Sequence, residues 1–160
     1  MIQILECTDL QSEHVAFIHA LWNNEYPESL RHTSLSETMS YLDGLEKPHH
    51  WFATDNNLFI GWLTVFGRDD ADWFAMILDS SYQKQGIGRR LLKIAKGHKS
   101  LLNGWVIDHN STLKANGETY FSPLDFYTKN GFVTTNKRLE LPNLSAINIC
   151  WDSKIELPTA

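Results

Sequence analysis

The feature that most restricts the fold is the passage from an apolar segment, through a glycine turn, into a helix. The apolar run at residues 73–78 ends at a polar turn. Apolar residues then recur from Ile87 to Ala95 at the spacing of one helix face, and the pattern begins between Gly86 and Gly88. We therefore predict a strand, a loop and a helix in that order.

Glycines at the start of a helix suit the close approach of another molecule to the backbone. They carry no Cβ, and the first amides of a helix lack partners within it, so an anion is a natural ligand. Arg89 and Arg90 occupy the first turn, where the helix dipole disfavours cations unless an anion is present. From Lys84 to Lys99 there are six basic residues and no acidic one, whereas all 19 acidic residues lie elsewhere. The loop is predicted to bind an anion; a solvated amphipathic helix with a flexible glycine entry is the alternative.

The sequence Gln-Lys-Gln-Gly-Ile-Gly at residues 83–88 resembles the Gln/Arg-x-x-Gly-x-Gly/Ala signature of the GNAT superfamily of acyl-CoA-dependent N-acetyltransferases. It lacks the Gly-Lys-Ser/Thr of a nucleotide triphosphate loop and the third glycine of a dinucleotide fingerprint. The resemblance implies that loop amides bind the pyrophosphate of acetyl-CoA and that the preceding strand pairs with the pantetheine arm. The implied cofactor-binding residues are Leu78, Gln83, Lys84, Gln85, Gly86, Ile87, Gly88, Arg89 and Arg90.

A second motif lies further along the chain. Phe-Tyr-Thr-Lys-Asn-Gly-Phe at residues 126–132 resembles the GNAT segment Phe-Tyr-x-Lys-x-Gly-Phe. The resemblance implies that Tyr127 protonates the departing thiolate of CoA, which suits a phenol of pKa ~10 beside a thiol of pKa ~8.5. The alternative is a tyrosine that packs on the sheet with its hydroxyl satisfied. Phe126 and Phe132 are assigned to the core.

The periodicity of the remaining chain predicts the other elements. Thr8 or Asp9 is the expected cap of the first helix, Ser34 of the second, and Ser122 of the last, with Pro123 at the first helical position. Asp-Asn-Asn at residues 55–57 is expected to form a tight turn. The predicted strands are 2–7, 51–54, 58–66, 73–78, 105–107, 133–139 and 146–151, and the predicted helices are about 10–24, 34–45, 86–97 and 123–130.

The strand-helix-strand connection across residues 73–107 predicts a parallel pair with a right-handed crossover. Ligands of such sheets bind beyond the carboxyl ends of the strands, where the glycine loop lies. With the resemblance, the expected fold is an α/β fold of the α+β type, a single GNAT-like domain over residues 1–160. Its central mixed, mostly antiparallel sheet has six to seven strands, about four flanking helices, and one parallel strand pair at the cofactor cleft.

The composition limits the class of protein. With 42% hydrophobic and 21% charged residues the chain is of ordinary globular type, and its net charge of −5 argues against nucleic acid or an anionic membrane as a partner. Cys7 and Cys150 are far apart, so we expect two buried thiols and no metal site. No leader pattern or long apolar run occurs, so a cytoplasmic protein is expected.

The resemblance also points to the side of the site that receives the acceptor. In the family, the first two helices and the loop between them form one wall, so Trp22, Glu25, Tyr26 and Glu28 are candidates to touch substrate, although each also suits a core or surface role. Family members commonly carry an asparagine near the last helix, where the register here gives Tyr120. Asn110 or Asn116, in the atypical loop 109–122, could supply that contact. His49 and His50 are adjacent on a strand and point to opposite faces, so they are read as non-ligands.

The implied reaction is direct acetyl transfer within a ternary complex. A primary amine attacks the thioester carbonyl, the Leu78 amide donates a hydrogen bond to the developing oxyanion, and Tyr127 protonates the departing thiolate. The base that deprotonates the amine is not specified by the sequence: the candidates are Asp72, Asp79, Glu25, Asp108, His109 or water.

Two classes of function remain open from the sequence. The first is an N-acetyltransferase that acts on the amine of a small molecule or, alternatively, of a protein. The second is a domain that binds acyl-CoA without turnover and regulates a partner. The oligomeric state is open too, with a homodimer among the options.

Overall fold

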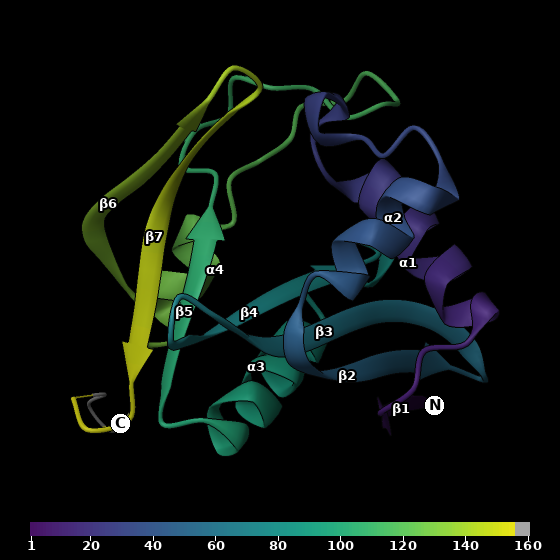
Figure 1. Ribbon diagram of the computed structural model, residues 1–160, viewed down its shortest axis with the longest axis horizontal. Coiled ribbons are helices and arrows are strands. Elements are labelled where there is room, and N and C mark those ends of the chain that lie inside the picture. The colour runs from purple at the N-terminus through teal and green to yellow at the C-terminus, as the bar shows by residue number, and fades with distance from the viewer. Residues whose placement is uncertain (156–160) are drawn as a thin grey trace.

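The computed structural model describes residues 1–155, and its centre is one seven-stranded sheet with the strand order β1-β2-β3-β4-β5-β7-β6 (Figure 1). Only β4 and β5 pair in parallel; the other neighbours are antiparallel. This confirms the predicted fold class. The strands are β1 Ile2–Cys7, β2 Glu46–Asp55, β3 Leu58–Arg68, β4 Ala71–Leu78, β5 Leu101–Val106, β6 Val133–Leu141 and β7 Leu144–Asp152. The helices are α1 Ser12–Glu25, α2 Leu35–Asp43, α3 Ile87–His98 and α4 Leu124–Lys129, with short 3-10 turns at Glu28–Leu30 and Ser80–Tyr82.

Helices cover both faces of the sheet. Helix α3 packs on one face and α1 with α2 on the other (Figure 1). Successive strand residues alternate between these cores: Leu63 and Phe74 belong to the α3 side, whereas Trp62 and Trp73 belong to the α1 side. None of the helices in residues 1–155 is long and apolar enough to cross a bilayer.

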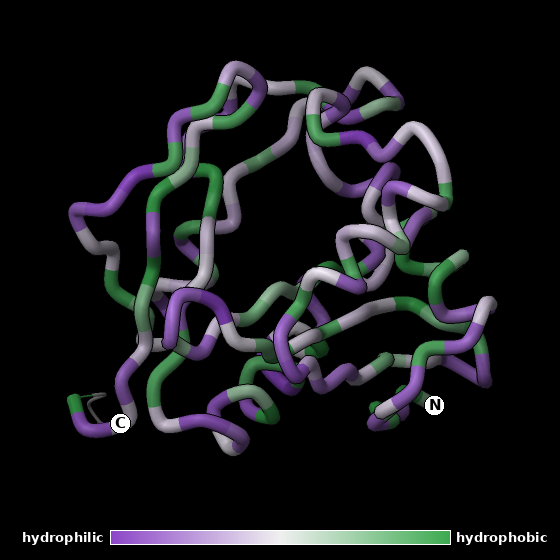
Figure 2. Tube along the Cα trace, in the orientation of Figure 1, coloured by the Kyte–Doolittle hydropathy of each residue, from purple (hydrophilic) through white to green (hydrophobic). Residues whose placement is uncertain are grey.

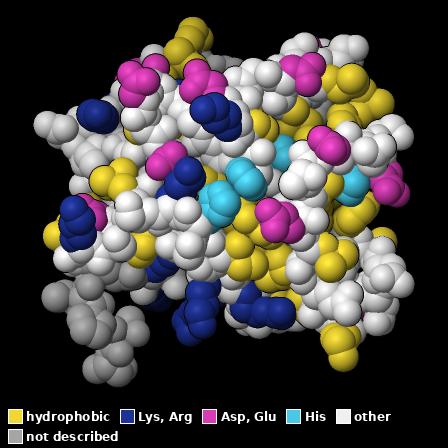
Figure 3. All heavy atoms as spheres, turned by 60° about the horizontal axis from the view of Figure 1, so that its bottom comes forward, with side chains coloured by type: hydrophobic (Ala, Val, Ile, Leu, Met, Phe, Trp, Pro, Cys, Tyr) yellow, Lys and Arg dark blue, Asp and Glu magenta, His cyan; other side chains and the backbone are white. Residues whose placement is uncertain are grey.

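One edge of the sheet is polar, and the surface mixes charged and apolar side chains. The edge strand β6 is largely hydrophilic along its course (Figure 2), in keeping with its mostly exposed residues. On the face in Figure 3, acidic, basic and histidine side chains are interspersed among uncharged ones. Charged edge strands disfavour unwanted pairing with other chains.

Two-residue turns join the central strands. Asn56 and Asn57 have φ of 49° and 70° between the paired residues Asp55 and Leu58, which confirms the predicted tight turn. A second such turn joins β3 to β4. Strand β2 starts five residues earlier than predicted, because Lys47 adopts a φ of 44° at a register shift that carries the strand past Pro48.

The helix ends test the predicted caps. Helix α1 begins after Gln11, not after Thr8 or Asp9, and His14 Nδ1 accepts the Gln11 backbone N–H at 2.9 Å. Ser34 is confirmed as the cap of α2, since its hydroxyl accepts from the Glu37 amide at 3.3 Å. The predicted cap of α4 is displaced by one residue: Pro123 is the N-cap, and Ser122 Oγ accepts from the Leu124 amide at 3.2 Å.

The two cysteines differ from the prediction, whereas the histidine pair agrees with it. Cys7 and Cys150 are free but only partly buried, so the expectation of buried thiols is wrong; Cys7 ends the edge strand β1, where one side of the sheet has no neighbour. His50 is buried and accepts from Trp62 Nε1 at 3.1 Å, whereas the His49 ring lies 4.5 Å from that of His98 on α3. The pair therefore points to opposite faces, as predicted.

The parallel pair is brief, and this opens the sheet. Strands β4 and β5 share one register pair, Trp73 with Asn103, after which β5 continues along β7 alone. Gly104 follows at once, and a Cβ there would lie 2.8 Å from the Phe74 ring. The carboxyl half of β4 is thus left without a strand on one side.

Candidate active site

A cleft of about 580 Å³ lies at the carboxyl end of β4. Its walls come from the last residues of β4, the glycine loop before α3, the first part of α4, and the segment at residues 119–123. Glu25 and Tyr26 at the end of α1 close one end of it. The cleft therefore lies where the sequence predicted a cofactor site.

The backbone at the end of β4 turns two amides toward this opening. The Asp79 amide donates to Ile60 O on β3 at 2.9 Å. Backbone groups of alternate strand residues point to opposite sides, so the amides of Leu78 and Met76 face away from β3. That is the side from which β5 has diverged, and both residues line the cleft.

The glycine loop supplies a second set of backbone donors. Gly86 is the N-cap of α3 with a φ of 83°, a conformation that favours glycine. Within residues 1–155 the amides of Ile87, Gly88 and Arg89 have no acceptor, because the first helical bond runs from the Arg90 amide to Gly86 O at 3.1 Å. Three convergent amides at a helix N-terminus, next to an arginine, fit a pyrophosphate.

Fewer loop amides are free to bind a ligand than the sequence implied. The Gln83 amide donates to Ser80 O at 3.3 Å and the Arg90 amide is used within the helix, so neither is free. The side chains of Gln85 and Ile87 turn away from the cleft: Gln85 Nε2 donates to Ser81 O at 3.4 Å, and Ile87 is buried in the core. Among the predicted cofactor residues, those that line the cleft are Leu78, Gln83, Lys84, Gly86, Gly88 and Arg89.

Tyr127 lies at the back of the cleft, on α4. Rings of Phe74, Phe126 and Phe132 surround it, with centroids between 5.2 and 5.7 Å from its own. Gly131, at a φ of 91°, ends the helix, and the Phe132 amide donates back to Tyr127 O at 3.1 Å, which confirms the predicted glycine stop. The Tyr127 hydroxyl has no hydrogen-bond partner within residues 1–155, and burial raises the pKa of this phenol well above its usual value.

Two more tyrosines border the same space. Tyr120 occupies the predicted register position and lines the cleft with Tyr26. Burial, and then the negative charge of Glu25, raises the pKa of Tyr120 to about 12. The two asparagines considered in its place serve the loop instead: Asn110 accepts from the Ser122 amide at 2.7 Å and Asn116 from the Glu118 amide at 2.9 Å.

Of the five residues considered as a base, only Glu25 lines the cleft. Both of its carboxylate oxygens are engaged: Oε2 accepts from the Ser80 amide at 3.0 Å and Oε1 lies 3.2 Å from Lys114 Nζ. The two side chains are only 11% and 13% exposed. Glu25 therefore ties α1, the end of β4 and the loop 109–122 together.

The other four candidates lie outside the cleft and have local partners. Asp72 lies 3.7 Å from Lys99, at the opposite end of β4. Asp79 accepts from the Ser81 amide, and His109 Nδ1 accepts from the Ser111 amide. Asp108 forms a two-bond ion pair with Arg138, which lowers the pKa of that carboxyl.

A second cavity, a groove of about 210 Å³, meets the cleft and extends across the α1 face of the sheet. Tyr26, Met76, Tyr120, Pro123 and Tyr127 border both spaces. The sequence had indicated Trp22 and Tyr26 here, but Glu28 lines neither space. No sequence pattern had indicated the other lining residues Tyr41, Phe66, Arg68, Trp73 and Trp105.

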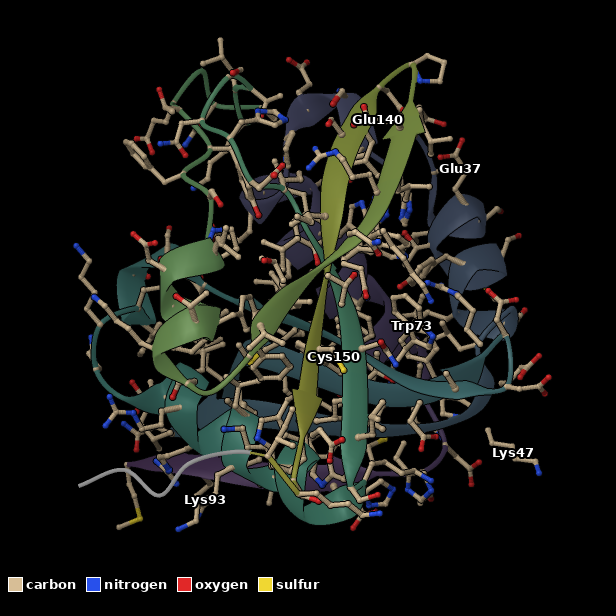
Figure 4. All side chains as sticks on the ribbon, turned by 90° about the vertical axis from the view of Figure 1, so that its left-hand side faces the viewer. Glu37, Lys47, Trp73, Lys93, Glu140 and Cys150 are labelled. Atoms are coloured by element: carbon tan, nitrogen blue, oxygen red, sulfur yellow. The ribbon has the colours of Figure 1, made fainter. Side chains whose placement is uncertain are left out.

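The groove is built from aromatic rings. Trp73 and Trp105 are 5.5 Å apart across β4 and β5, and Figure 4 shows Trp73 on the side of β5 and β7 that faces α2. Trp22 packs on Tyr26 and Tyr41 at 4.7 and 4.9 Å, and its Nε1 donates to Leu30 O at 2.8 Å. A cofactor-sized cleft with free amides thus joins an aromatic groove at Tyr127.

Comparisons with known proteins agree with this geometry. The family model described as "Acetyltransferase (GNAT) domain" matches residues 46–134, more than half of the chain, whereas comparison with curated proteins finds no match.

Among solved structures, an aminoglycoside 6'-N-acetyltransferase complexed with coenzyme A is 17% identical, with 99% of both chains covered and a TM-score of 0.68. An aminoglycoside 6'-acetyltransferase type Ii is 16% identical over 99% of both chains, with a TM-score of 0.69. An acyl-CoA N-acyltransferase from Pseudomonas aeruginosa is 13% identical, with 94% of this chain and 99% of that chain covered, and a TM-score of 0.66. At these sequence identities the similar structures support the fold alone. The family model, which matches more than half of the chain, shows that this chain belongs to the GNAT family of acetyltransferases.

Proposed function

We propose that the protein transfers the acetyl group of acetyl-CoA to the primary amine of a small molecule, by direct attack in a ternary complex. One observation carries this proposal: the Tyr127 hydroxyl, which has no partner within residues 1–155, lies where the amide-lined cleft meets the aromatic groove. A cofactor and an acceptor that entered from the two spaces would meet at this tyrosine.

The chain's own groups divide the work. Acetyl-CoA supplies an acetyl thioester, whose C–S bond is exchanged for the C–N bond of the product. In this proposal the amides of Ile87, Gly88 and Arg89 hold the pyrophosphate, and the β4 amides at Met76 and Leu78 face the acyl end. Tyr127 holds a proton at its hydroxyl for the departing sulfur, because burial keeps its pKa well above neutrality. The acceptor's ammonium proton passes to water, since Glu25 is already engaged by Ser80 and Lys114.

The size of the groove supports a small molecule over a protein amine. The loop 109–122 packs against the chain after α1, where the Glu28 amide donates to Leu113 O at 2.9 Å and Pro27 pairs with Lys114. Leu30 from the chain after α1 and Tyr120 from this loop line the groove, whose volume is only about 210 Å³.

The test is thiol release from acetyl-CoA with a panel of amines, beside thermal unfolding with acetyl-CoA alone. We expect release that depends on the amine, and about 2.7 kcal/mol of stabilisation when acetyl-CoA is at a hundredfold excess over its dissociation constant. Stabilisation without turnover by any amine would favour the non-catalytic, acyl-CoA-binding alternative. Absence of stabilisation would contradict the cofactor assignment itself.

A further inference from the structure

The residues that line the groove restrict the chemistry of an acceptor that could bind there. The inference below rests on the proposed acetyl transfer. We infer that the acceptor is an amine with an aromatic or branched apolar body and a remote carboxylate, and that Arg68 binds this carboxylate at the end of the groove away from Tyr127.

The first support is the chemistry of the groove walls. Nine aromatic side chains within residues 1–155 line it: Trp22, Tyr26, Tyr41, Phe66, Trp73, Phe74, Trp105, Tyr120 and Tyr127. Among the lining residues that the structure describes there is no aspartate or glutamate, and the one charged side chain is Arg68. Aromatic walls favour an apolar or aromatic ligand body, whose burial contributes about 25 cal/mol per Å².

The second support is the state of Arg68. Its guanidinium carbon lies 5.0 Å from the Phe66 ring centroid and 5.5 Å from that of Trp73, so it lies over the groove floor. The side chain is partly buried, and no carboxylate pairs with it within residues 1–155. A guanidinium binds a carboxylate through two parallel hydrogen bonds, and the attraction is stronger where water is partly excluded.

The spacing along β4 between the Arg68 contact and the free amides sets the length of the acceptor. Arg68 reaches the ring of Trp73, and the amides of Met76 and Leu78 follow three and five residues later on β4. At ~3.4 Å per strand residue, these amides lie roughly 10–17 Å along β4 from Trp73, the residue whose ring the cation contacts. An extended tripeptide spans about 10 Å from its amine to its carboxylate, and a tetrapeptide about 13 Å.

The same groups disfavour a polycationic acceptor. A polyamine or aminoglycoside carries several ammonium groups, which need carboxylates or other acceptors when they are buried. Glu25, the carboxylate on the cleft wall, is already paired with Lys114 at 3.2 Å. Among the described residues that line the groove, the one charge offered to such a ligand is the repulsive one of Arg68.

The test compares Phe-Phe-Gly with its C-terminal amide, beside spermidine and kanamycin, in the thiol-release assay. We expect kcat/KM for the free acid to exceed that for the amide by about tenfold, the factor for a 1.4 kcal/mol difference. Both cations should be poorer acceptors than the acid. Arg68→Gln should abolish the preference for the acid by raising its KM, while Arg68→Lys should retain part of it. The KM for acetyl-CoA should stay within about twofold of wild type in both variants.

Binding of the two peptides in the presence of CoA, followed by calorimetry, gives a readout that does not need turnover. Wild type should bind the acid more tightly than the amide, and Arg68→Gln should bind them equally. Equal binding by wild type, better turnover of spermidine or kanamycin than of the acid, or an equal loss for acid and amide in Arg68→Gln would each overturn the inference. The first test above, thiol release with any amine, would still stand or fall by itself, so the two failures are distinguishable.

Discussion

The cleft and the groove offer a ligand different groups. In the cleft these are backbone amides, at Ile87, Gly88 and Arg89 and at the end of β4. In the groove they are side chains, mostly rings, with Arg68 as the single charge among the described lining residues. Backbone recognition depends on local conformation, and here a glycine with a φ of 83° is enough to shape it. Side-chain recognition depends on which distant residues the sheet brings together.

This difference has a chemical consequence at the junction. Tyr26, Tyr120 and Tyr127 border both spaces, and burial raises the pKa of each phenol. These three tyrosines therefore keep their hydroxyl protons across the physiological range. Within residues 1–155 neither the cleft nor the groove has a free carboxylate on its walls, since Glu25 is already engaged. Substitutions of the tyrosines between the two spaces should affect kcat. Substitutions in the cleft alone or in the groove alone should affect the KM of one substrate only.

The largest expected effect is at Tyr127. Replacing it with Phe removes the hydroxyl proposed to protonate the departing sulfur and leaves the walls of the cleft and the groove intact. The kcat should therefore fall about 100- to 1,000-fold, or about 3–4 kcal/mol of barrier. Steady-state kinetics with both substrates varied is the measurement, and both KM values should stay within about twofold. Wild-type kcat should not fall through tyrosine ionisation between pH 7 and 10, since burial holds the Tyr127 pKa above that range.

Tyr82→Phe is the matched control for this change. It removes a hydroxyl that donates to Asp55 at 2.9 Å, outside both cavities, and kcat should not change. A Tyr127→Phe enzyme as fast as this control would exclude the tyrosine as the proton donor.

The second largest effect is expected at His50 and should change the stability of the fold without changing the catalytic rate. His50 is buried on the α1 side, and burial lowers its pKa from 6.5 to about 4. Above pH 6.5 His50 is neutral in both the native and the unfolded chain, so the native state is at its most stable with respect to this group. Between pH 6.5 and about 4 the unfolded chain binds a proton at His50 that the native chain does not, and this lowers the free energy of unfolding. We expect the free energy of unfolding to decrease over that window by about 3 kcal/mol from this group.

Urea unfolding at several pH values measures this, with His50→Gln as the comparison. The variant should lose this part of the pH dependence while its glutamine can still accept from Trp62 Nε1. If the free energy of unfolding had the same pH dependence in both proteins, a group other than His50 would be responsible for the acid sensitivity. If kcat fell at low pH while the protein stayed folded, the sensitive group would lie in the active site.

The fold and the conformation of the glycine loop could be predicted because local signals and the resemblance of two motifs to a family both bear on them. The motifs at residues 83–88 and 126–132, and the Asn56-Asn57 turn, each specify a conformation through neighbouring residues. The errors fell where local signals compete. Thr8, Asp9 and Ser12 can all cap a helix, yet Gln11 does so through His14, and the Lys47 bulge hides the start of β2.

The groove could not be predicted in the same way. Arg68, Trp73 and Trp105 come together only because β3, β4 and β5 are neighbours in the sheet. The ion pair of Glu25 with Lys114 joins residues 89 positions apart, so a sequence pattern could name Glu25 as a base without showing that its charge was already engaged.

The third effect should be confined to the cleft. A Gly86→Ala side chain would meet open space, but its φ of 83° is unfavourable for alanine by about 1–2 kcal/mol. The loop amides should shift, so the KM for acetyl-CoA should rise roughly tenfold while the KM for the amine stays unchanged. Gly97→Ala is the control: it also meets open space, lies inside α3, and should stabilise the helix by up to about 1 kcal/mol. Equal KM values for acetyl-CoA in the two variants would contradict a role for the loop amides.

The smallest effect should be confined to the groove. Trp105→Leu keeps an apolar side chain but removes the ring that packs 5.5 Å from Trp73, a contact of about 0.5–1.5 kcal/mol with an aromatic neighbour or ligand. The KM for an aromatic amine should rise about two- to tenfold, and the KM for acetyl-CoA should not change. Because Trp105 is only partly buried, melting temperatures of the two proteins should stay close. If Trp105→Leu raised the KM for acetyl-CoA instead, the two spaces would not recognise their ligands separately, and the division between backbone and side-chain recognition would have to be abandoned.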